Sequence, residues 1–343
     1  MTGPPETSPP RDLLVGRLER DFYLTEQGRA LLDVPGGNAL YSAVGYRIWE
    51  ADRQPGLMAR VGENYPQAWL SKLRSLGLDI RGVKILARSL EARRFYSLEA
   101  DGRSALGHPM ALFSRLERQL PAALIGYSPP EHQSINHRKR THHTLRQEDL
   151  PGPYQVATAA HLCPVDFLTH NLLPSVFRQE GFTTVTLQPC PEYMEPNIFP
   201  DLPALVTGLT AFLPLERDLR GLYKRRTADL WEMAVETASF GCALVVIQRR
   251  EGGQLLYIRD SDQRWEIPDY PGRSAKQVGE DAAFCGGFLA GYRRSFDPLE
   301  AVLHGNVSAS LVREGLDPFY ALDTMDRLPA ARLEFLRGKP RRI

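Results

Sequence analysis

The sequence is poor in cysteine and contains no long apolar run. Its four cysteines are widely spaced and form no Cys-x-x-Cys pair; they are Cys163, Cys190, Cys242 and Cys285. This spacing argues against a disulfide framework and against a structural zinc site. We therefore expect buried thiols of a cytoplasmic protein, with Cys285 packed in the core rather than acting as a nucleophile. No apolar run reaches the roughly 18 residues that span a bilayer, so we expect no membrane partner.

An excess of charge of one sign is also lacking. The 343 residues include 42 Lys and Arg against 41 Asp and Glu, which gives a formal net charge of +1. A dedicated nucleic-acid binder is usually clearly basic, so we expect no nucleic-acid partner. The first ten residues lack the basic and apolar regions of a secretion signal. Residues 1–11 are predicted to be a disordered tail.

Strand-like and helix-like segments alternate along most of the chain. The predicted strands are 12–16, 56–62, 83–88, 92–99, 154–162, 183–187, 211–214 and 242–247, with a hairpin of 253–257 and 264–267. The predicted helices are 38–47, 66–76, 166–180, 201–209, 227–240, 282–294 and 298–312. This alternation predicts a mainly parallel sheet with helices on both faces.

Two strand-rich stretches, 20–35 and 83–100, do not fit the alternation. We expect them to form a small separate sheet over the main one. The domain is predicted to cover 12–330, and 331–343 is predicted to be a basic C-terminal tail.

The stretch 131–147 contains four of the eight histidines and four Lys or Arg residues. Such a basic run can hold a phosphate or an acidic partner, or it can be a solvated surface loop. The adjacent His142 and His143 point in different directions on a helix or strand, which weakens a metal-binding interpretation.

Several short motifs occur in a fixed order. Gly16 is followed five residues later by Asp21, and a Gly36-Gly37-Asn38 run opens the first predicted helix. Further along stand Arg60-Val-Gly-Glu-Asn64, Leu76-Gly-Leu-Asp79 and Phe284-Cys-Gly-Gly-Phe-Leu-Ala-Gly291. In order and spacing these motifs resemble those of the PfkB (ribokinase-like) carbohydrate kinases.

The resemblance implies a three-layer α/β sandwich with a mainly parallel central sheet and a small β lid. It also implies transfer of the ATP γ-phosphate, with Mg²⁺, to a hydroxyl of a sugar or nucleoside. The substrate side would be formed by Asp21, Gly36, Gly37 and Asn38. Subunits of this family often pair through the lid, so a homodimer is a fair expectation by resemblance.

The chain departs from the family at its Gly-Ala-Gly-Asp signature, which aligns with Gly279-Glu280-Asp281-Ala282. The aspartate that takes the hydroxyl proton in the family is Ala282 here, and a methyl group cannot accept a proton. Asp281 stands one residue early, about 100° away on a helix. A one-residue bulge would be needed for it to replace the missing base.

Glu280 and Asp281 also place two carboxylates where phosphate oxygens would dock. At about 4 Å and an effective dielectric constant near 20, each like-charge pair opposes binding by roughly 4 kcal/mol. The alternative is that these acids simply stabilise a helix N-terminus.

The nucleotide side is altered as well. The family's Asn-x-x-Glu motif, which organises Mg²⁺, aligns with Leu215-Glu-Arg-Asp218, so that Asp218 is the remaining candidate metal ligand. Arg250 stands where a glycine is usual and would either contact phosphate or fill the pocket. With Gly253, Gly279, Glu280 and Asp281 it completes the predicted nucleotide and anion site.

Three hypotheses remain open. The first is a PfkB kinase homologue with a degraded ATP, Mg²⁺ and base centre, which binds a small polyol-like ligand or a partner with little or no phosphotransfer. The second is an active ATP-dependent sugar or nucleoside kinase that uses Asp281 as its base. The third is a non-catalytic structural or regulatory protein. ATP and Mg²⁺ are cofactors only if the protein is active.

Overall fold

A computed structural model describes residues 8–129 and 139–343. Its main feature is a ten-stranded sheet that is parallel from β5 to β11 and antiparallel from β11 to β14. In spatial order the strands are β14 (Arg341–Arg342), β13 (Gln263–Ile267), β12 (Gln254–Ile258), β11 (Leu244–Gln248), β10 (Ala211–Phe212), β9 (Thr184–Leu187), β8 (Ala159–Leu162), β1 (Asp12–Val15), β4 (Gly56–Gly62) and β5 (Asp79–Leu86).

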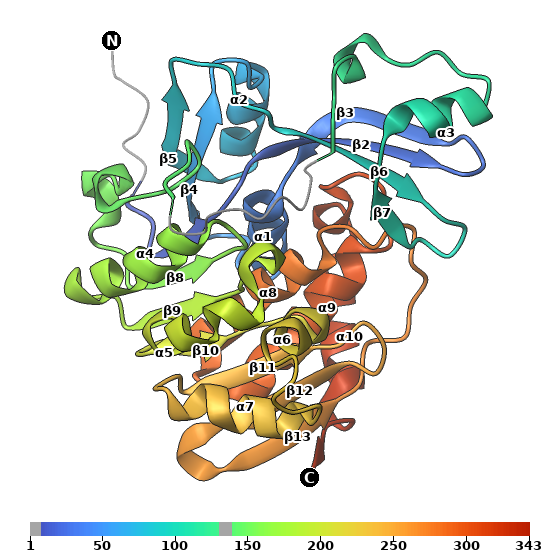
Figure 1. The fold of residues 1–343 in the computed structure, drawn as a ribbon. Coiled ribbons are helices and arrows are strands. Elements are labelled where there is room, and N and C mark those ends of the chain that lie inside the picture. Colours follow the sequence, from blue (N-terminus) through green and yellow to red (C-terminus); the bar gives the residue numbers. More distant parts are fainter. Residues whose placement is uncertain (1–7, 130–138) are drawn as a thin grey trace.

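Helices cover both faces of this sheet, which gives three layers (Figure 1). One face packs against α1 (Asn38–Arg47), α2 (Gln67–Ser75), α8 (Glu280–Ser295), α9 (Pro298–Val312) and α10 (Leu328–Arg337). The other packs against α4 (Phe167–Gln179), α5 (Leu202–Val206), α6 (Glu216–Leu222) and α7 (Leu230–Ser239). Strand β1 shows the period of two: Leu14 joins the first core, while Leu13 and Val15 join the second.

A second sheet of four strands forms the lid, in the order β3 (Ala30–Gly36), β2 (Glu19–Thr25), β6 (Arg93–Leu98) and β7 (Ser104–Leu106). It has a small core of its own, in which Phe22 and Phe95 pack with residues of α3 (Pro109–Arg115). The α/β sandwich with a separate small sheet agrees with the fold expected from the sequence.

Two predicted boundaries differ from the structure. Residues 83–86 belong to β5, which pairs in parallel with β4 in the main sheet, and the lid's remaining strand is β7. A half-exposed edge strand has the same alternation in either sheet, so periodicity could not place it. The stretch 331–343 is not a tail: α10 packs in the core through Leu333 and Leu336, and β14 pairs with β13.

All four cysteines are buried and free, as predicted. Among the described residues, no helix is long and apolar enough to cross a membrane. Residues 1–7 of the predicted tail and 131–138 of the His-rich stretch lie outside the described residues.

Candidate functional site

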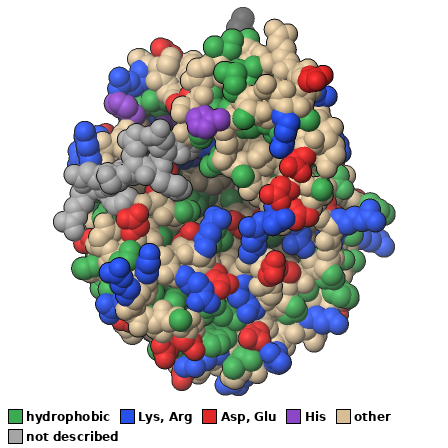
Figure 2. Space-filling model, turned by 45° about the vertical axis from the view of Figure 1, so that its right-hand side comes forward, with side chains coloured by type: hydrophobic (Ala, Val, Ile, Leu, Met, Phe, Trp, Pro, Cys, Tyr) green, Lys and Arg blue, Asp and Glu red, His purple; other side chains and the backbone are tan. Residues whose placement is uncertain are grey.

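A cavity of about 680 Å³ lies between the lid and the nucleotide side expected from the sequence. Lid strands β6 and β7 contribute Tyr96 and Ser104, and the opposite wall comes from the starts of α6 and α8 and the end of β11. Five arginines line it together: Arg217, Arg220, Arg249, Arg250 and Arg313. The hollow near the centre of Figure 2 is bordered by acidic and basic side chains on the same face.

The first turn of α8 forms one wall of this cavity. Gly279 precedes the helix with a left-handed φ of 81°, and a Cβ there would lie 2.3 Å from the Tyr41 ring, so the position requires glycine. The helix is regular over its whole length, Glu280–Ser295, without the bulge that would rotate Asp281 into the position of the base. Ala282 is buried at that position.

The acids of this turn face the arginines. Burial, and then the neighbouring Asp281, raise the pKa of Glu280 to about 8. Burial also raises the pKa of Asp281, and the positive charges of Arg217 and Arg250 oppose this shift. Asp281 therefore lies among charged residues of the cavity, on the side that the sequence predicts to hold the nucleotide.

Asp218, the predicted metal ligand, lies close to Asp281. Burial raises its pKa to about 6, Arg217 opposes that shift and Asp281 adds to it. Its Oδ2 is buried without a hydrogen-bond partner among the described residues. Residues 8–129 and 139–343 contain no group of three or more His, Cys, Asp and Glu side chains that could hold a metal ion. Mg²⁺ at Asp218 would thus need ligands from phosphate or water.

Other nucleotide-side residues are held by local contacts. Arg250 reaches the cavity and donates a 2.8 Å hydrogen bond to Gln277 Oε1. Gly253 has a φ of 75° and packs so closely on the Ile267 carbonyl that a Cβ would lie 2.0 Å away. Leu215 forms a bridge with Gln248 and offers no oxygen to a cation.

On the substrate side, Asp21 is fully buried on lid strand β2. Tyr23 donates a 2.6 Å hydrogen bond to its Oδ2, while Oδ1 has no partner among the described residues. A Cβ on Gly36 would lie 2.0 Å from the Asp21 carboxyl carbon, so this glycine makes room for the acid. Burial, with Glu19 nearby, raises the pKa of Asp21 to about 7.

Asn38 and Gly37 connect the start of α1 to neighbouring loops. The Asn38 side chain accepts a 2.8 Å hydrogen bond from the Arg17 backbone N–H and donates one of 2.6 Å to the Pro164 carbonyl. Gly37 has a φ of 95°, and a Cβ there would lie 2.4 Å from the Arg17 carbonyl oxygen. These residues hold the loops around Asp21 together, and the Asn38 amide is already engaged.

The structure therefore brings the predicted residues together in two groups. Glu280, Asp281 and Arg250 line the open cavity, and Asp21 is buried on β2 against the hydroxyls of Tyr23 and Tyr41. The sequence analysis missed the residue that joins the two groups, Tyr41, whose ring packs under Gly279 and whose hydroxyl contacts Tyr23 at 2.7 Å.

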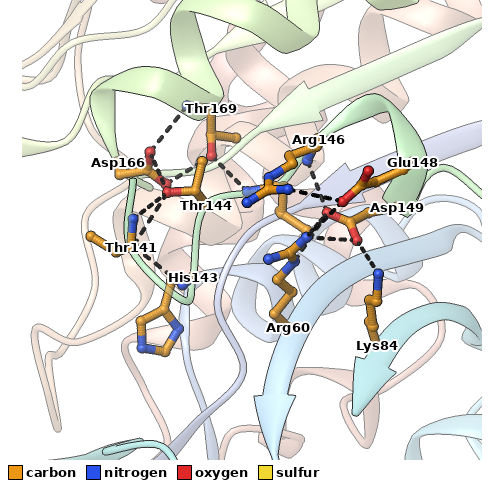
Figure 3. A network of polar contacts seen from close by, with 11 residues as sticks. Arg60, Lys84, Thr141, His143, Thr144, Arg146, Glu148, Asp149, Asp166 and Thr169 are labelled. Atoms are coloured by element: carbon orange, nitrogen blue, oxygen red, sulfur yellow. Dashed lines mark hydrogen bonds and ion pairs between the residues drawn. The ribbon is translucent and has the colours of Figure 1, made fainter. Parts of the chain in front are cut away.

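The sequence analysis also missed an ion-pair network that anchors the described part of the His-rich stretch (Figure 3). Arg60 pairs with the buried Asp149 at 2.6 Å, and Lys84 reaches the same carboxylate at 3.1 Å. His143 projects away from this network. Burial, with Arg17 and Arg94, lowers its pKa to about 4, so it is neutral near pH 7.

Comparisons with known proteins agree with this architecture. No family model matches the chain. It is 28% identical over 291 residues to a cytidine kinase of Thermococcus kodakarensis, covering 84% of this chain and 90% of that protein. The structure resembles a putative ribokinase II from E. coli (TM-score 0.69, 14% identity, covering 95% and 99% of the two chains).

It also resembles a Burkholderia thailandensis nucleoside kinase in complex with inosine, with a TM-score of 0.64, 17% identity and coverage of 96% and 98%. The putative ribokinase II is also known in complex with ATP and Mg²⁺. The chain therefore has the ribokinase-like fold, and over most of its length its sequence is similar to that of a cytidine kinase.

Proposed function

We propose that this protein binds a small polyhydroxylated molecule, such as a sugar or nucleoside, at Asp21 and transfers phosphate to it poorly or not at all. The first turn of α8 carries this proposal. Ala282 occupies the position of the proton-accepting aspartate, and the helix is regular around it. Asp281 is influenced by Arg217, Asp269 and Arg250, on the nucleotide side.

The chemistry of the cavity fits a nucleotide phosphate poorly. Glu280 and Asp281 stand at the helix N-terminus where backbone N–H groups would otherwise receive the anion. Leu215 replaces an oxygen ligand near the metal position. The negative charges of these acids already offset part of the positive charge of the arginines that line the cavity.

The substrate side, in contrast, is built to receive a hydroxyl group. One oxygen of Asp21 is bound by Tyr23, and the other is buried without a partner among the described residues. A buried carboxylate oxygen without a hydrogen bond is costly, and a ligand hydroxyl would satisfy it. The buried Tyr65 hydroxyl also has no hydrogen-bond partner in the described part of the chain, and the nearby charge of Asp21 adds to burial in raising the pKa of this tyrosine.

A second candidate is an active ATP-dependent sugar or nucleoside kinase with Asp281 as its base. It is favoured by the similarity to the cytidine kinase, which extends over most of both chains. Its phosphate ligands would be the cavity arginines, and Mg²⁺ would be held by Asp218.

Calorimetric titration of cytidine, inosine and D-ribose, each with and without Mg·ATP, separates these candidates. We expect one ligand class to bind the wild type and to bind Asp21→Asn at least tenfold more weakly. Asp33→Asn is the matched control, because it removes a carboxylate from the same lid sheet, where Asp33 pairs with Arg20. Mass spectrometry of the same mixtures should show no phosphorylated product.

A phosphorylated product that disappears in Asp281→Asn would establish the second candidate instead. If none of these ligands binds, the small-molecule proposal is wrong and a structural or regulatory role is left.

A further inference from the structure

Lys276 is a fully buried cation in the short segment before α8. Its Nζ donates hydrogen bonds to the Tyr41 hydroxyl at 2.9 Å and to the Leu316 carbonyl at 2.8 Å. It also lies over the rings of Tyr23 and Tyr41, 4.8 and 4.7 Å from their centres. An ammonium group removed from water needs such partners, so this position is held by specific contacts rather than by chance burial.

A continuous chain of hydrogen bonds leads from this ammonium to the Asp21 carboxylate. The Tyr41 and Tyr23 hydroxyls are 2.7 Å apart, and Tyr23 donates to Asp21 Oδ2 at 2.6 Å. Because a lysine ammonium can only donate, Tyr41 accepts from Lys276, and its own proton is free for Tyr23 or for Asp21 Oδ2, which lies 3.4 Å away. Every donor in the chain therefore points toward Asp21.

Close packing holds two members of this chain in place. The Asp21 carboxyl in the lid lies against the backbone of Gly36, and the Tyr41 ring lies against Gly279, just before α8. Neither side chain can shift toward its glycine. The chain thus couples the lid to the segment that opens α8.

We propose that Lys276 is a positioning residue of the ligand site, which acts through the Tyr41 and Tyr23 hydroxyls to hold the Asp21 carboxyl with Oδ1 directed to a ligand hydroxyl. The proposal rests on the proposed function in one respect, that the ligand binds at Asp21. Nothing in the family resemblance assigns this role to Lys276.

The charge of Lys276 also opposes the effect of burial on Asp21, whose pKa is about 7. Burial lowers the pKa of Lys276 to about 8, against the attraction of Asp21 and Asp317. The titratable and charged groups that act on Asp21 or are acted on by it come from several elements: Glu19 and Tyr23 of β2, Tyr41 of α1, Tyr65 after β4, Arg94 and Tyr96 of β6, and Lys276.

The test is a pH titration of the Asp21 carboxyl by ¹³C NMR in the full chain, with the resonance assigned by its loss in Asp21→Asn. Without the Lys276 cation, the carboxylate loses its stabilising charge. Lys276→Met should therefore raise the Asp21 pKa by at least about half a unit, a threefold change in proton affinity. Tyr41→Phe should shift it in the same direction, because it interrupts the chain but keeps the lysine.

Lys72→Met is the matched control, since Lys72 also lies over an aromatic ring, 4.4 Å from the centre of Phe319, but does not join the chain. It should leave the Asp21 titration unchanged. An Asp21 titration that is the same in the wild type, Lys276→Met and Tyr41→Phe would overturn the proposal. If Lys276→Met does not fold, Tyr41→Phe decides alone.

Ligand titrations separate this proposal from the one on which it rests. With cytidine and D-ribose as probes, Lys276→Met should weaken binding at least threefold at pH 7 and less at pH 9, where Asp21 is ionised in both proteins. Shifted Asp21 titrations without binding of either probe would refute the proposed ligand class and leave the hydrogen-bond chain supported. Binding that is equally tight in the wild type and Lys276→Met would refute the positioning role.

Discussion

Replacing Asp281 by asparagine isolates the charge that most directly opposes a phosphate at the start of α8. The substitution keeps the size of the side chain and removes one negative charge. Two unit charges 4 Å apart at an effective dielectric constant near 20 repel by about 4 kcal/mol. The cavity is open to solvent, and Arg217 and Arg250 already offset part of the charge. We therefore expect about a third of that value, or roughly tenfold tighter binding of Mg·ATP.

Isothermal titration of Mg·ATP into the wild type and Asp281→Asn measures this difference. The gain should be larger at pH 8.5 than at pH 6, because more of the wild-type acid is ionised and repels the phosphate. Asp260→Asn serves as the control, since that exposed acid pairs with Arg259 away from the cavity. Weaker Mg·ATP binding in Asp281→Asn would refute the reasoning, because it would mean that this carboxylate holds the nucleotide or its metal.

Three further substitutions test the framework around the site. Arg60→Met leaves the buried Asp149 with Lys84 and the Arg146 backbone N–H as partners, and should lower the free energy of unfolding by about 2 kcal/mol in a urea titration. Gly279→Ala places a Cβ against the Tyr41 ring at a left-handed φ, and should cost about 2 kcal/mol in the same assay. Burial raises the pKa of Glu280 from 4.5 to about 8, so the folded chain holds this proton more tightly than the unfolded chain. The stability that Glu280 contributes is complete below pH 4.5 and is lost as the pH rises through 8. Between pH 5 and 9, the melting temperature of Glu280→Gln should therefore fall less than that of the wild type.

Much of the fold could be predicted because local signals and tertiary packing agree. The helix 38–47, the strand 56–62 and the helix 298–312 have the predicted bounds in the structure. Each begins or ends at a residue that restricts the backbone, such as the Gly37 N-cap of α1 or the Pro298 at the start of α9. Strand β5 was placed in the wrong sheet because an edge strand with one exposed face carries no information on its neighbour.

The contacts within the site were less accessible to prediction. Motifs located Asp21 and the start of α8, because each is a short run with a fixed spacing. The chain of hydrogen bonds between them joins residues up to 235 positions apart, Tyr41 and Lys276, and neither has a local pattern that marks the contact. The orientation of Asp281 likewise depends on whether α8 is regular, which the sequence left open.

The charged residues of the cleft bear on the proposed ligand-binding function. Burial raises the pKa of Glu280, which Arg313 and Arg250 oppose, and that of Asp281, which Arg217 and Arg250 oppose, so these acids lie within the electrostatic influence of the cavity arginines. The ammonium of Lys276 is linked to Asp21 through the hydroxyls of Tyr41 and Tyr23. Burying two charges costs desolvation free energy, and replacing one partner of such a pair destabilises the folded protein strongly. The partnered Lys276 and Asp21 support the proposed ligand-binding role, in which Asp21 would offer an oxygen to a hydroxyl and the acids at the start of α8 would disfavour a phosphate.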